Sequence, residues 1–375
     1  MIMGNCFKYI SMALVATILF AACARIDRDD SLEEIFFRVA SFGSPGTKAD
    51  DYKDNYASVP FGAYAYFKAD NPTDNTNFMI NQKIAFNGID TWSPEGSTYY
   101  WPKSGSLDFI CYSPYSEDGI DTPLPVITED SINYPAWDVN SHRDVDILYS
   151  DKAVGQTGNA NTYYYNGVPV LFHHALSRVG FKVRLAYSEI QPETMDKTKW
   201  EVTVNSITLK DILTTGSMGL TLNGTTWEKP DTGIWTSDGS SEDIVLDVSS
   251  LGPLTDTEPQ TVGESFLVLP QSLQEGQKVI LNLTIKTFRD IGSGYVQVLQ
   301  ETDVPIEASL ANGSLNKWGM NQSISYTLVL MPSRSTGTGV DSDGDGIDDQ
   351  VPSEIHFDPA VEGWESVSVN AAINI

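Results

Sequence analysis

The sequence predicts an all-β fold built from two tandem β-sandwich domains. Beyond residue 34, apolar and polar residues alternate with period two, which is the pattern of half-buried strands. Clusters of Gly, Pro, Asn, Asp and Ser separate these runs, and long helical periodicity is absent. The length of 375 residues suggests two domains, and a hydrophobic fraction of 41% is enough to bury two cores.

The alternation predicts strands in order along the chain, at residues 35–42, 61–67, 107–112, 179–185, 202–209, 244–248, 279–285 and 324–330. Residues 174–178 form the one candidate short helix, and the alternative is that they lead into a strand. Residues 155–162 are turn-rich, and a new apolar set begins at Val168. We therefore expect an N-terminal domain at 35–170 and a C-terminal domain at 171–375.

The first residues have the form of an export signal. Residues 1–22 include an apolar stretch from Ile10 to Ala22 that is short for crossing a bilayer. The motif Phe20-Ala21-Ala22-Cys23 resembles a bacterial lipobox, which predicts that Cys23 carries a lipid. Ordinary signal cleavage near the same place is the alternative. Residues 23–34 are polar and acidic and are expected to form a tether.

Three cysteines occur, at positions 6, 23 and 111. Cys6 would leave with the signal and Cys23 would carry the lipid, so only Cys111 would remain and no intrachain disulfide is expected. Cys111 lies in an alternating strand and is expected to be buried rather than reactive. The fold would then depend on burial and on hydrogen bonds within its sheets.

The charge balance limits the classes of function. The chain has 23 Lys and Arg against 50 Asp and Glu, a formal net charge of −27. Nucleic-acid affinity comes largely from Lys and Arg. Because acidic residues far outnumber them here, we expect no nucleic-acid partner. No His-Glu-x-x-His, Gly-x-Ser-x-Gly or phosphate-loop motif occurs, and we expect no enzymatic activity and no catalytic residues.

Several segments together carry a family resemblance: residues 99–115, 144–149, 172–183, 266–271 and 355–364. In this order they resemble the fimbrillin-like lipoproteins of Bacteroides and its relatives, the subunits of type V pili. The resemblance implies two tandem transthyretin-like β-sandwich domains and a lipid-anchored location on the outer membrane, in a fimbria that supports cell adhesion. It also implies that a trypsin-like protease removes the first strand. The C-terminal strand of another copy, or of a related pilin, then fills the open groove.

The residues for this strand exchange can be placed in the sequence. The strand to be removed is 35–42, followed by an exposed loop at 43–50 in which Lys48 is the first cleavage candidate. Arg38, within the strand, is the second. Lys48 could equally be an ordinary solvated loop lysine.

The donor strand is predicted at residues 365–375. Its apolar residues fall on one face of an extended strand: Val367, Val369, Ala371, Ile373 and Ile375. The alternative is that this segment pairs with its own C-terminal domain.

An acidic run resembles a calcium loop. Oxygen ligands would come from Asp341, Asp343, Asp345 and Asp349 and from the backbone carbonyl of Ile347, with glycine at the sixth position. Pro352 stands at the twelfth position, where a carboxylate normally closes the coordination shell. The segment is therefore either a Ca²⁺ site or a solvated linker, and no other cofactor is expected.

Two other functions remain open at this point. A surface carbohydrate-binding module could use tryptophans in turn-rich segments as stacking platforms, namely Trp92, Trp101, Trp227 and Trp235. A fimbrial tip adhesin would accept a donor strand without giving one. The adjacent His173 and His174 would point to opposite faces of a strand, so they are interpreted as structural rather than metal-binding.

Overall fold

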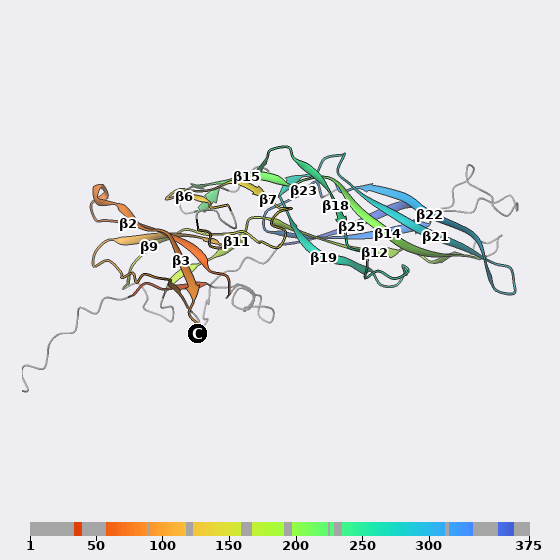
Figure 1. The fold of residues 1–375 in the computed structure, drawn as a ribbon, viewed down its shortest axis with the longest axis horizontal. Helices are drawn as coiled ribbons and strands as arrows, with labels where there is room; N and C mark the ends of the chain where they lie inside the picture. The colour runs from red at the N-terminus through yellow and green to blue at the C-terminus, as the bar shows by residue number, and fades with distance from the viewer. Residues whose placement is uncertain are drawn as a thin grey trace, which may run out of the picture.

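A computed structural model of the chain is an elongated all-β molecule (Figure 1). It describes residues 34–39, 58–88, 91–117, 123–158, 167–190, 197–223, 226–228, 235–311, 315–332 and 352–363. Within these residues the helical structure is one short 3₁₀ turn, η1 (Pro72–Asp74). No helix in the described part of the chain is long and apolar enough to span a membrane.

The N-terminal region is organised around a nine-stranded sheet, with order β10-β1-β4-β3-β2-β5-β8-β11 and β9 paired to β5. Its strands are β1 (Phe37–Val39), β2 (Phe61–Lys68), β3 (Thr76–Phe86), β4 (Trp92–Pro94), β5 (Ser106–Ser113), β8 (Leu148–Ser150), β9 (Ala153–Gln156), β10 (Val168–Val170) and β11 (Phe172–His174). The two ends of this order, β10 and β11, are separated in the chain only by Leu171. The sheet therefore returns on itself.

A five-stranded sheet covers one face of this first sheet, with order β16-β15-β7-β6 and β17 paired to β15. Its strands are β6 (Val126–Thr128), β7 (Ser131–Asp138), β15 (Thr215–Asn223), β16 (Thr226–Glu228) and β17 (Trp235–Ser237). The β15 to β7 pairing joins residues on both sides of the predicted limit at residue 170. The chain thus returns from the C-terminal region to complete the N-terminal one.

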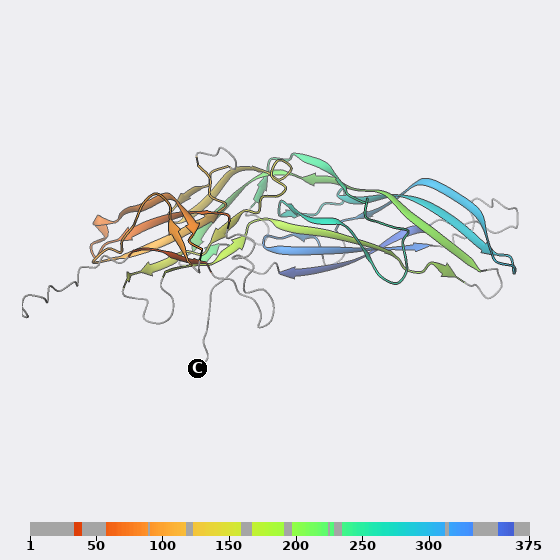
Figure 2. The same ribbon diagram turned by 60° about the horizontal axis from the view of Figure 1, so that its bottom comes forward.

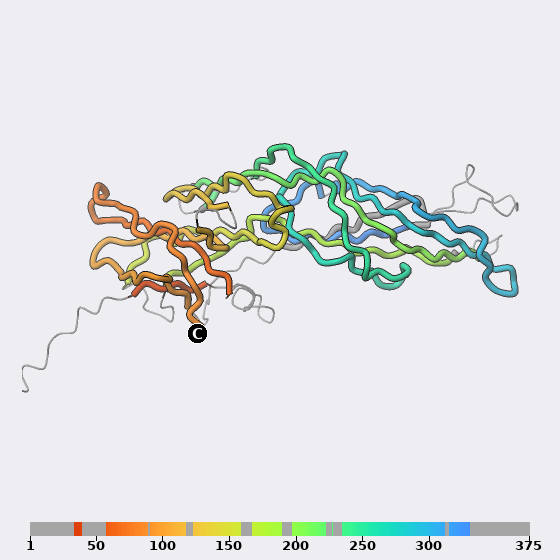
Figure 3. The backbone as a smooth tube through the Cα atoms, viewed as in Figure 1, coloured from red at the N-terminus to blue at the C-terminus, as the bar shows by residue number. Residues whose placement is uncertain are grey.

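The C-terminal region is a sandwich whose long strands follow the long axis of the molecule (Figures 2 and 3). One sheet has the order β19-β12-β24-β25, and the other has β13-β14-β21-β22 with β18 paired to β14. The first contains β12 (Ser177–Leu185), β19 (Gln260–Val268), β24 (Gln322–Pro332) and β25 (Pro352–Gly363). The second contains β13 (Glu189–Ile190), β14 (Thr198–Leu213), β18 (Ser241–Leu246), β21 (Lys278–Asp290) and β22 (Tyr295–Ser309). A separate pair joins β20 (Gln271–Ser272) and β23 (Lys317–Trp318).

Three hydrophobic clusters form the core. The Phe37 cluster lies inside the nine-stranded sheet, and the Trp137 cluster lies between that sheet and the five-stranded one. The Leu281 cluster fills the C-terminal sandwich. Burial of this apolar surface is the main force that favours the folded state.

The predicted all-β fold is confirmed, and each of the eight strands predicted from residues 35–330 overlaps an observed one, whereas the predicted donor strand at 365–375 lies outside the described residues. Residues 174–178 belong to β11 and β12 and the bend between them, so this segment leads into a strand. The alternation did not reveal β3, β7, β15, β19 or β22. Their exposed and intermediate positions carry mixed residues, as in the pattern of β22, which is almost entirely unburied.

Candidate functional site

Strand β1 occupies the seam at which the nine-stranded sheet closes. It pairs in parallel with β10, with Phe37 opposite Val168, and meets β4 antiparallel at the single pair Phe37 and Trp92. Two further backbone bonds flank it. The Ile35 N–H donates to the Tyr99 carbonyl at 2.8 Å, and the Val168 N–H donates to the Phe36 carbonyl at 2.8 Å.

The side chains of this segment enter the core. Ile35 and Phe37 are 2% and 0% exposed. The Phe37 ring makes edge contacts with Phe61 and Phe109, with centroid distances of 5.7 and 5.6 Å. Edge-to-face pairs of this kind add about 0.5–1.5 kcal/mol each to the burial of the ring. A three-residue strand therefore supplies a central side chain of the Phe37 cluster.

Gly167 lets β10 approach β1 closely. A Cβ at this position would lie 3.0 Å from the Phe36 carbonyl oxygen, and the φ of +146° disfavours other residues. Because the neighbouring oxygen belongs to the backbone, it can shift little to make room for a side chain. The geometry of the seam thus needs a glycine where β10 begins.

Loss of β1 would leave the sheet open. The facing edges of β10 and β4 would lose their hydrogen-bond partner, and Phe61, Phe109 and Trp92 would face the vacated space. Unpaired edges and exposed apolar surface are unfavourable in water. An extended segment with alternating apolar side chains would pair with the edges and cover the apolar surface. Chemically, the β1 position is a slot for a strand.

Arg38 is the one sequence-predicted residue of the exchange mechanism that lies within the described residues, and it is part of this slot. Arg38 is the middle residue of β1, partly buried and opposite Pro169 of β10. Cys23, Lys48, the donor residues Val367, Val369, Ala371, Ile373 and Ile375, and the calcium candidates Asp341, Asp343, Asp345, Ile347 and Asp349 lie outside the described residues.

Strand β25 was not predicted from the sequence. It pairs antiparallel with β24 of its own sheet, from Gln322 opposite Gly363 to Pro332 opposite Pro352. The alternation of Ile355, Phe357 and Val361 could have indicated it. The described chain therefore ends on a strand in its own C-terminal sandwich, immediately before the predicted donor segment.

The tryptophans proposed as sugar-stacking platforms are buried, so that hypothesis is wrong for these residues. Trp92, Trp101, Trp227 and Trp235 are each at most 8% exposed. The indole N–H of Trp227 donates to the Ser150 carbonyl at 2.8 Å, and that of Trp235 donates to the Ala175 carbonyl at 2.7 Å. Turn-rich surroundings suggested exposure, but these rings fill the core beneath the turns.

The two adjacent histidines have separate partners, in agreement with a structural role. His173 Nε2 lies 3.0 Å from Asp151 Oδ1, and His174 Nδ1 lies 2.6 Å from Asp146 Oδ2. Among the described residues no group of three or more His, Cys, Asp and Glu side chains is arranged to hold a metal ion.

Cys111 is buried in β5, as expected. Burial raises the pKa of its thiol well above the ordinary value, although a hydrogen bond with Ser150 acts in the opposite direction. Because the thiolate is the reactive form of cysteine, this side chain behaves as an apolar core residue.

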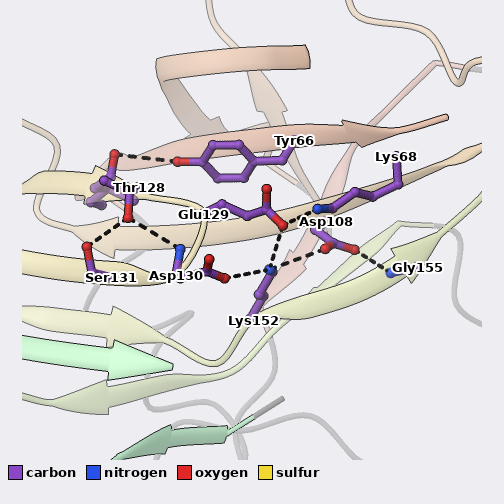
Figure 4. Close-up of polar contacts among 10 residues, drawn as sticks. Tyr66, Lys68, Asp108, Thr128, Glu129, Asp130, Ser131, Lys152 and Gly155 are labelled. Atoms are coloured by element: carbon purple, nitrogen blue, oxygen red, sulfur yellow. Dashed lines mark hydrogen bonds and ion pairs between the residues drawn. The ribbon is translucent and has the colours of Figure 1, made fainter. Parts of the chain in front are cut away.

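A charged cluster that sequence reasoning missed lies where β5 meets the turn between β6 and β7 (Figure 4). Lys152 Nζ is 3.3 Å from Asp108 Oδ2, 3.5 Å from Glu129 Oε1 and 3.8 Å from Asp130 Oδ1. Lys68 makes a second ion pair with Glu129. Burial tends to raise the pKa of Glu129, but the hydrogen bond from Lys68 and the charge of Lys152 lower it below the ordinary value. Nothing in the local sequence marks these residues, because they converge from four separate segments.

Comparisons with known proteins match this architecture. A family model described as fimbrillin-like matches residues 47–343, more than half of the chain. A search of curated proteins finds no match.

Several solved structures of bacterial proteins align with most of this chain. A fimbrial protein from Bacteroides vulgatus aligns with a TM-score of 0.53 at 15% identity, covering 88% of this chain and 99% of that one. A candidate cell adhesion protein from Bacteroides uniformis gives 0.49 at 15% identity, covering 88% and 99%. The fimbrial anchor protein Mfa2 from Porphyromonas gingivalis gives 0.28 at 12% identity, covering 90% and 99%.

Proposed function

Because this chain belongs to the fimbrillin-like family, we propose that it is a structural subunit of a surface fimbria, assembled by strand exchange at the position of β1. The subunit would consist of two transthyretin-like sandwiches. Proteolysis would remove β1, and residues 365–375 of another copy or a related pilin would enter the vacated slot. The assembled fimbria would support cell adhesion.

The observation that carries this proposal is the place of β1 in the nine-stranded sheet. It is three residues long, yet it closes the seam between β10 and β4 and buries Phe37 completely. Burying a phenylalanine side chain contributes about 1.5–3 kcal/mol to stability. A subunit that has lost β1 would therefore be stabilised by another strand that fills its place. A strand so short and so central can be exchanged without dismantling the rest of the sheet.

The predicted donor segment has the pattern that this slot requires. Ile35 and Phe37 are buried at alternate positions of β1, and the segment from Val367 to Ile375 places apolar residues at every second position. Side chains at positions i and i+2 share one face of a strand. An incoming strand in the direction of β1 would run parallel to β10 and antiparallel to β4.

Cleavage at Lys48 is favoured over cleavage at Arg38. Arg38 lies within β1 and pairs with Pro169, and a protease needs an accessible segment that can leave its strand. A cut after Lys48 would release all of β1 from the rest of the chain. A lipid on Cys23 would hold the uncut precursor at the outer membrane until then.

The proposal can be tested by changing one face of the donor segment at a time. We would substitute Val369→Asp and Ile373→Asp together on the apolar face, with Ser368→Asp and Asn370→Asp together as the matched control on the other face. Each purified full-length protein would be treated with trypsin and examined for filaments by electron microscopy. Burying two carboxylates without partners is costly, so the apolar-face variant should not assemble, whereas the control should.

Filaments formed equally by both variants would contradict the proposal, and so would filaments of wild-type protein that keep β1 uncut. Mass spectrometry of the assembled subunits identifies their N-terminus. A new N-terminus at Ala49 is the expected result.

A further inference from the structure

The buried amine of Lys152 lies against the buried carboxyl group of Asp108, and neither residue is part of the β1 slot. The Lys152 side chain is 5% exposed, and that of Asp108 is 6% exposed. Asp108 lies on β5, and Lys152 immediately precedes β9, which pairs with β5. By contrast, the side chains of the ion pair between Lys286 and Glu201 are 35% and 40% exposed.

The carboxyl group of Asp108 is oriented by two different neighbours. Its Oδ1 accepts a hydrogen bond of 2.8 Å from the Gly155 N–H, and its Oδ2 faces Lys152 Nζ at 3.3 Å (Figure 4). Glu129 Oε1 lies 3.5 Å from the same nitrogen and is itself held by Lys68. One amine, one polarised carboxyl group and one proton-accepting carboxylate thus meet at a single point.

We propose that Lys152 and Asp108 condense into an intramolecular amide bond that joins β5 to the segment preceding β9. Nζ forms a bond with Cγ of Asp108, and the bond between Cγ and Oδ2 breaks. The ammonium and carboxylate together contain the atoms of the amide plus one water molecule, so no oxidant, reductant or activating group is required.

Each neighbour has a defined part in this step. Glu129 accepts one proton from the Nζ ammonium, which frees the nitrogen lone pair for attack, and passes this proton to Oδ2. It then carries a second proton from the same nitrogen to Oδ2, so that Oδ2 holds two protons when its bond to Cγ breaks and the amide nitrogen keeps the third. The Gly155 N–H stabilises the negative charge that develops on Oδ1 as the tetrahedral intermediate forms. Oδ1 becomes the amide oxygen, Oδ2 leaves as water, and Glu129 ends in its starting state.

Burial and proximity both favour the amide over the ion pair. A buried ion pair carries a large desolvation cost that a neutral amide does not. Groups held in a reactive arrangement behave as if at an effective concentration of roughly 10⁵–10⁸ M, which offsets the unfavourable condensation in water. Lys286 and Glu201 are also close, at 2.6 Å, but their side chains are 35% and 40% exposed, so this pair lacks the desolvation cost that favours the amide.

The bond would strengthen the region that must tolerate an open seam. Cys111 is the only cysteine among the described residues, so no disulfide joins strands there. An amide between residues 108 and 152 would fix β5 and β9 while β1, on the other side of β2, β3 and β4, is absent.

The experiment is mass spectrometry of the unfolded full-length chain. We would compare wild type with Lys152→Arg, which keeps the charge but cannot form the amide, with Glu129→Gln, and with Lys286→Arg as the matched exposed control. After correction for each substitution, wild type and Lys286→Arg should be one water molecule lighter than Lys152→Arg. Glu129→Gln should show a mixture of both masses, because the proton carrier is lost.

Peptide mapping decides the site and remains decisive if a variant folds poorly. Wild type should yield one branched peptide that contains both Asp108 and Lys152, without tryptic cleavage after Lys152. Full cleavage after Lys152, an intact mass equal to that of the unmodified chain, or a water loss that persists in Lys152→Arg would each overturn the proposal in favour of a simple ion pair.

Discussion

The N-terminal and C-terminal regions are both all-β, but their sheets are held together differently. The nine-stranded N-terminal sheet closes through strands of three and four residues, with β1 and β10 at its seam. The C-terminal sheet is built on ladders between β14, β21 and β22, which have 16, 13 and 15 residues. Long ladders open only by cooperative unfolding, whereas a three-residue strand can leave alone.

The cores differ in the same way. Phenylalanines and tryptophans make up six of the sixteen buried residues of the Phe37 cluster, and Phe37 of β1 makes ring contacts with two of them. The Leu281 cluster consists mainly of Val, Ile and Leu that pair across neighbouring strands. The difference supports our proposal that a segment is exchanged at the N-terminal seam while the C-terminal sandwich stays intact.

The largest difference is expected for Phe37→Ala. Removal of this buried ring should lower the free energy of unfolding of the uncut subunit by about 3–5 kcal/mol, as measured by urea denaturation. Because residue 37 is removed on assembly in our account, filaments of this variant should melt at the wild-type temperature. Filaments with a lowered melting temperature would show that β1 stays in place.

Leu281→Ala is the counterpart in the C-terminal region. Leu281 is fully buried and lies opposite Ile207 and Ile306 on the neighbouring strands. The substitution should lower the free energy of unfolding by about 2–5 kcal/mol. Here the loss should appear in the uncut subunit and in the filament alike, measured by the same two methods. A loss in the uncut subunit alone would remove the distinction between the regions.

Gly167→Ala tests the geometry of the seam. The added Cβ would meet the Phe36 carbonyl oxygen in a strained backbone conformation, which should cost about 1–3 kcal/mol in the uncut subunit. Gly276→Ala in the C-terminal region is the control, because its Cβ would meet nothing within 4 Å and its φ is not positive. Equal unfolding free energies for the two variants would contradict the close approach of β10 to β1.

The smallest effect is expected for Asp256→Asn in the C-terminal region. The hydroxyl and backbone N–H of Ser188 both donate to Asp256 at 2.8 Å, and these hydrogen bonds lower the pKa of this carboxyl below its ordinary 3.8. The group is only partly buried, so its loss should cost less than about 1 kcal/mol.

The sign of its pH dependence follows from the lowered pKa. The stabilisation is complete above the unfolded value of 3.8 and is lost as pH falls through the lower folded pKa. The difference in unfolding free energy between wild type and Asp256→Asn should therefore be constant above about pH 5 and shrink as pH falls below about 4. A difference that grows on acidification would contradict the assignment.

The strands with strict alternation could be predicted from the sequence because each has one buried face, as in β12 and β21. The return of β15 to pair with β7 could not, since it is a long-range pairing that no local pattern encodes. The turn-rich surroundings of Trp227 and Trp235 were misleading because burial depends on which distant carbonyl accepts from each indole.

The candidate site was predictable only in part. The first strand follows from Ile35 and Phe37 at alternate positions, whereas its proposed removal follows from the family resemblance, for which the loop after it supplies a basic residue. Its place at the seam, between β10 and β4, depends on distant parts of the chain. Trp92 is 55 residues from Phe37 in the sequence, and Val168 is farther still. The meeting of Lys152 with Asp108 is likewise a product of tertiary packing.

The most direct measurement is a disulfide between the seam and the tail of a different molecule. Pro169 is exposed on β10 opposite Arg38, so Pro169→Cys in one tagged subunit would be mixed with Ser368→Cys, Asn370→Cys or Asn374→Cys in another. After trypsin treatment and oxidation, at least one pairing should link the two tags, and none should do so without trypsin. Links formed only within single chains, or formed equally before cleavage, would contradict exchange at the β1 position.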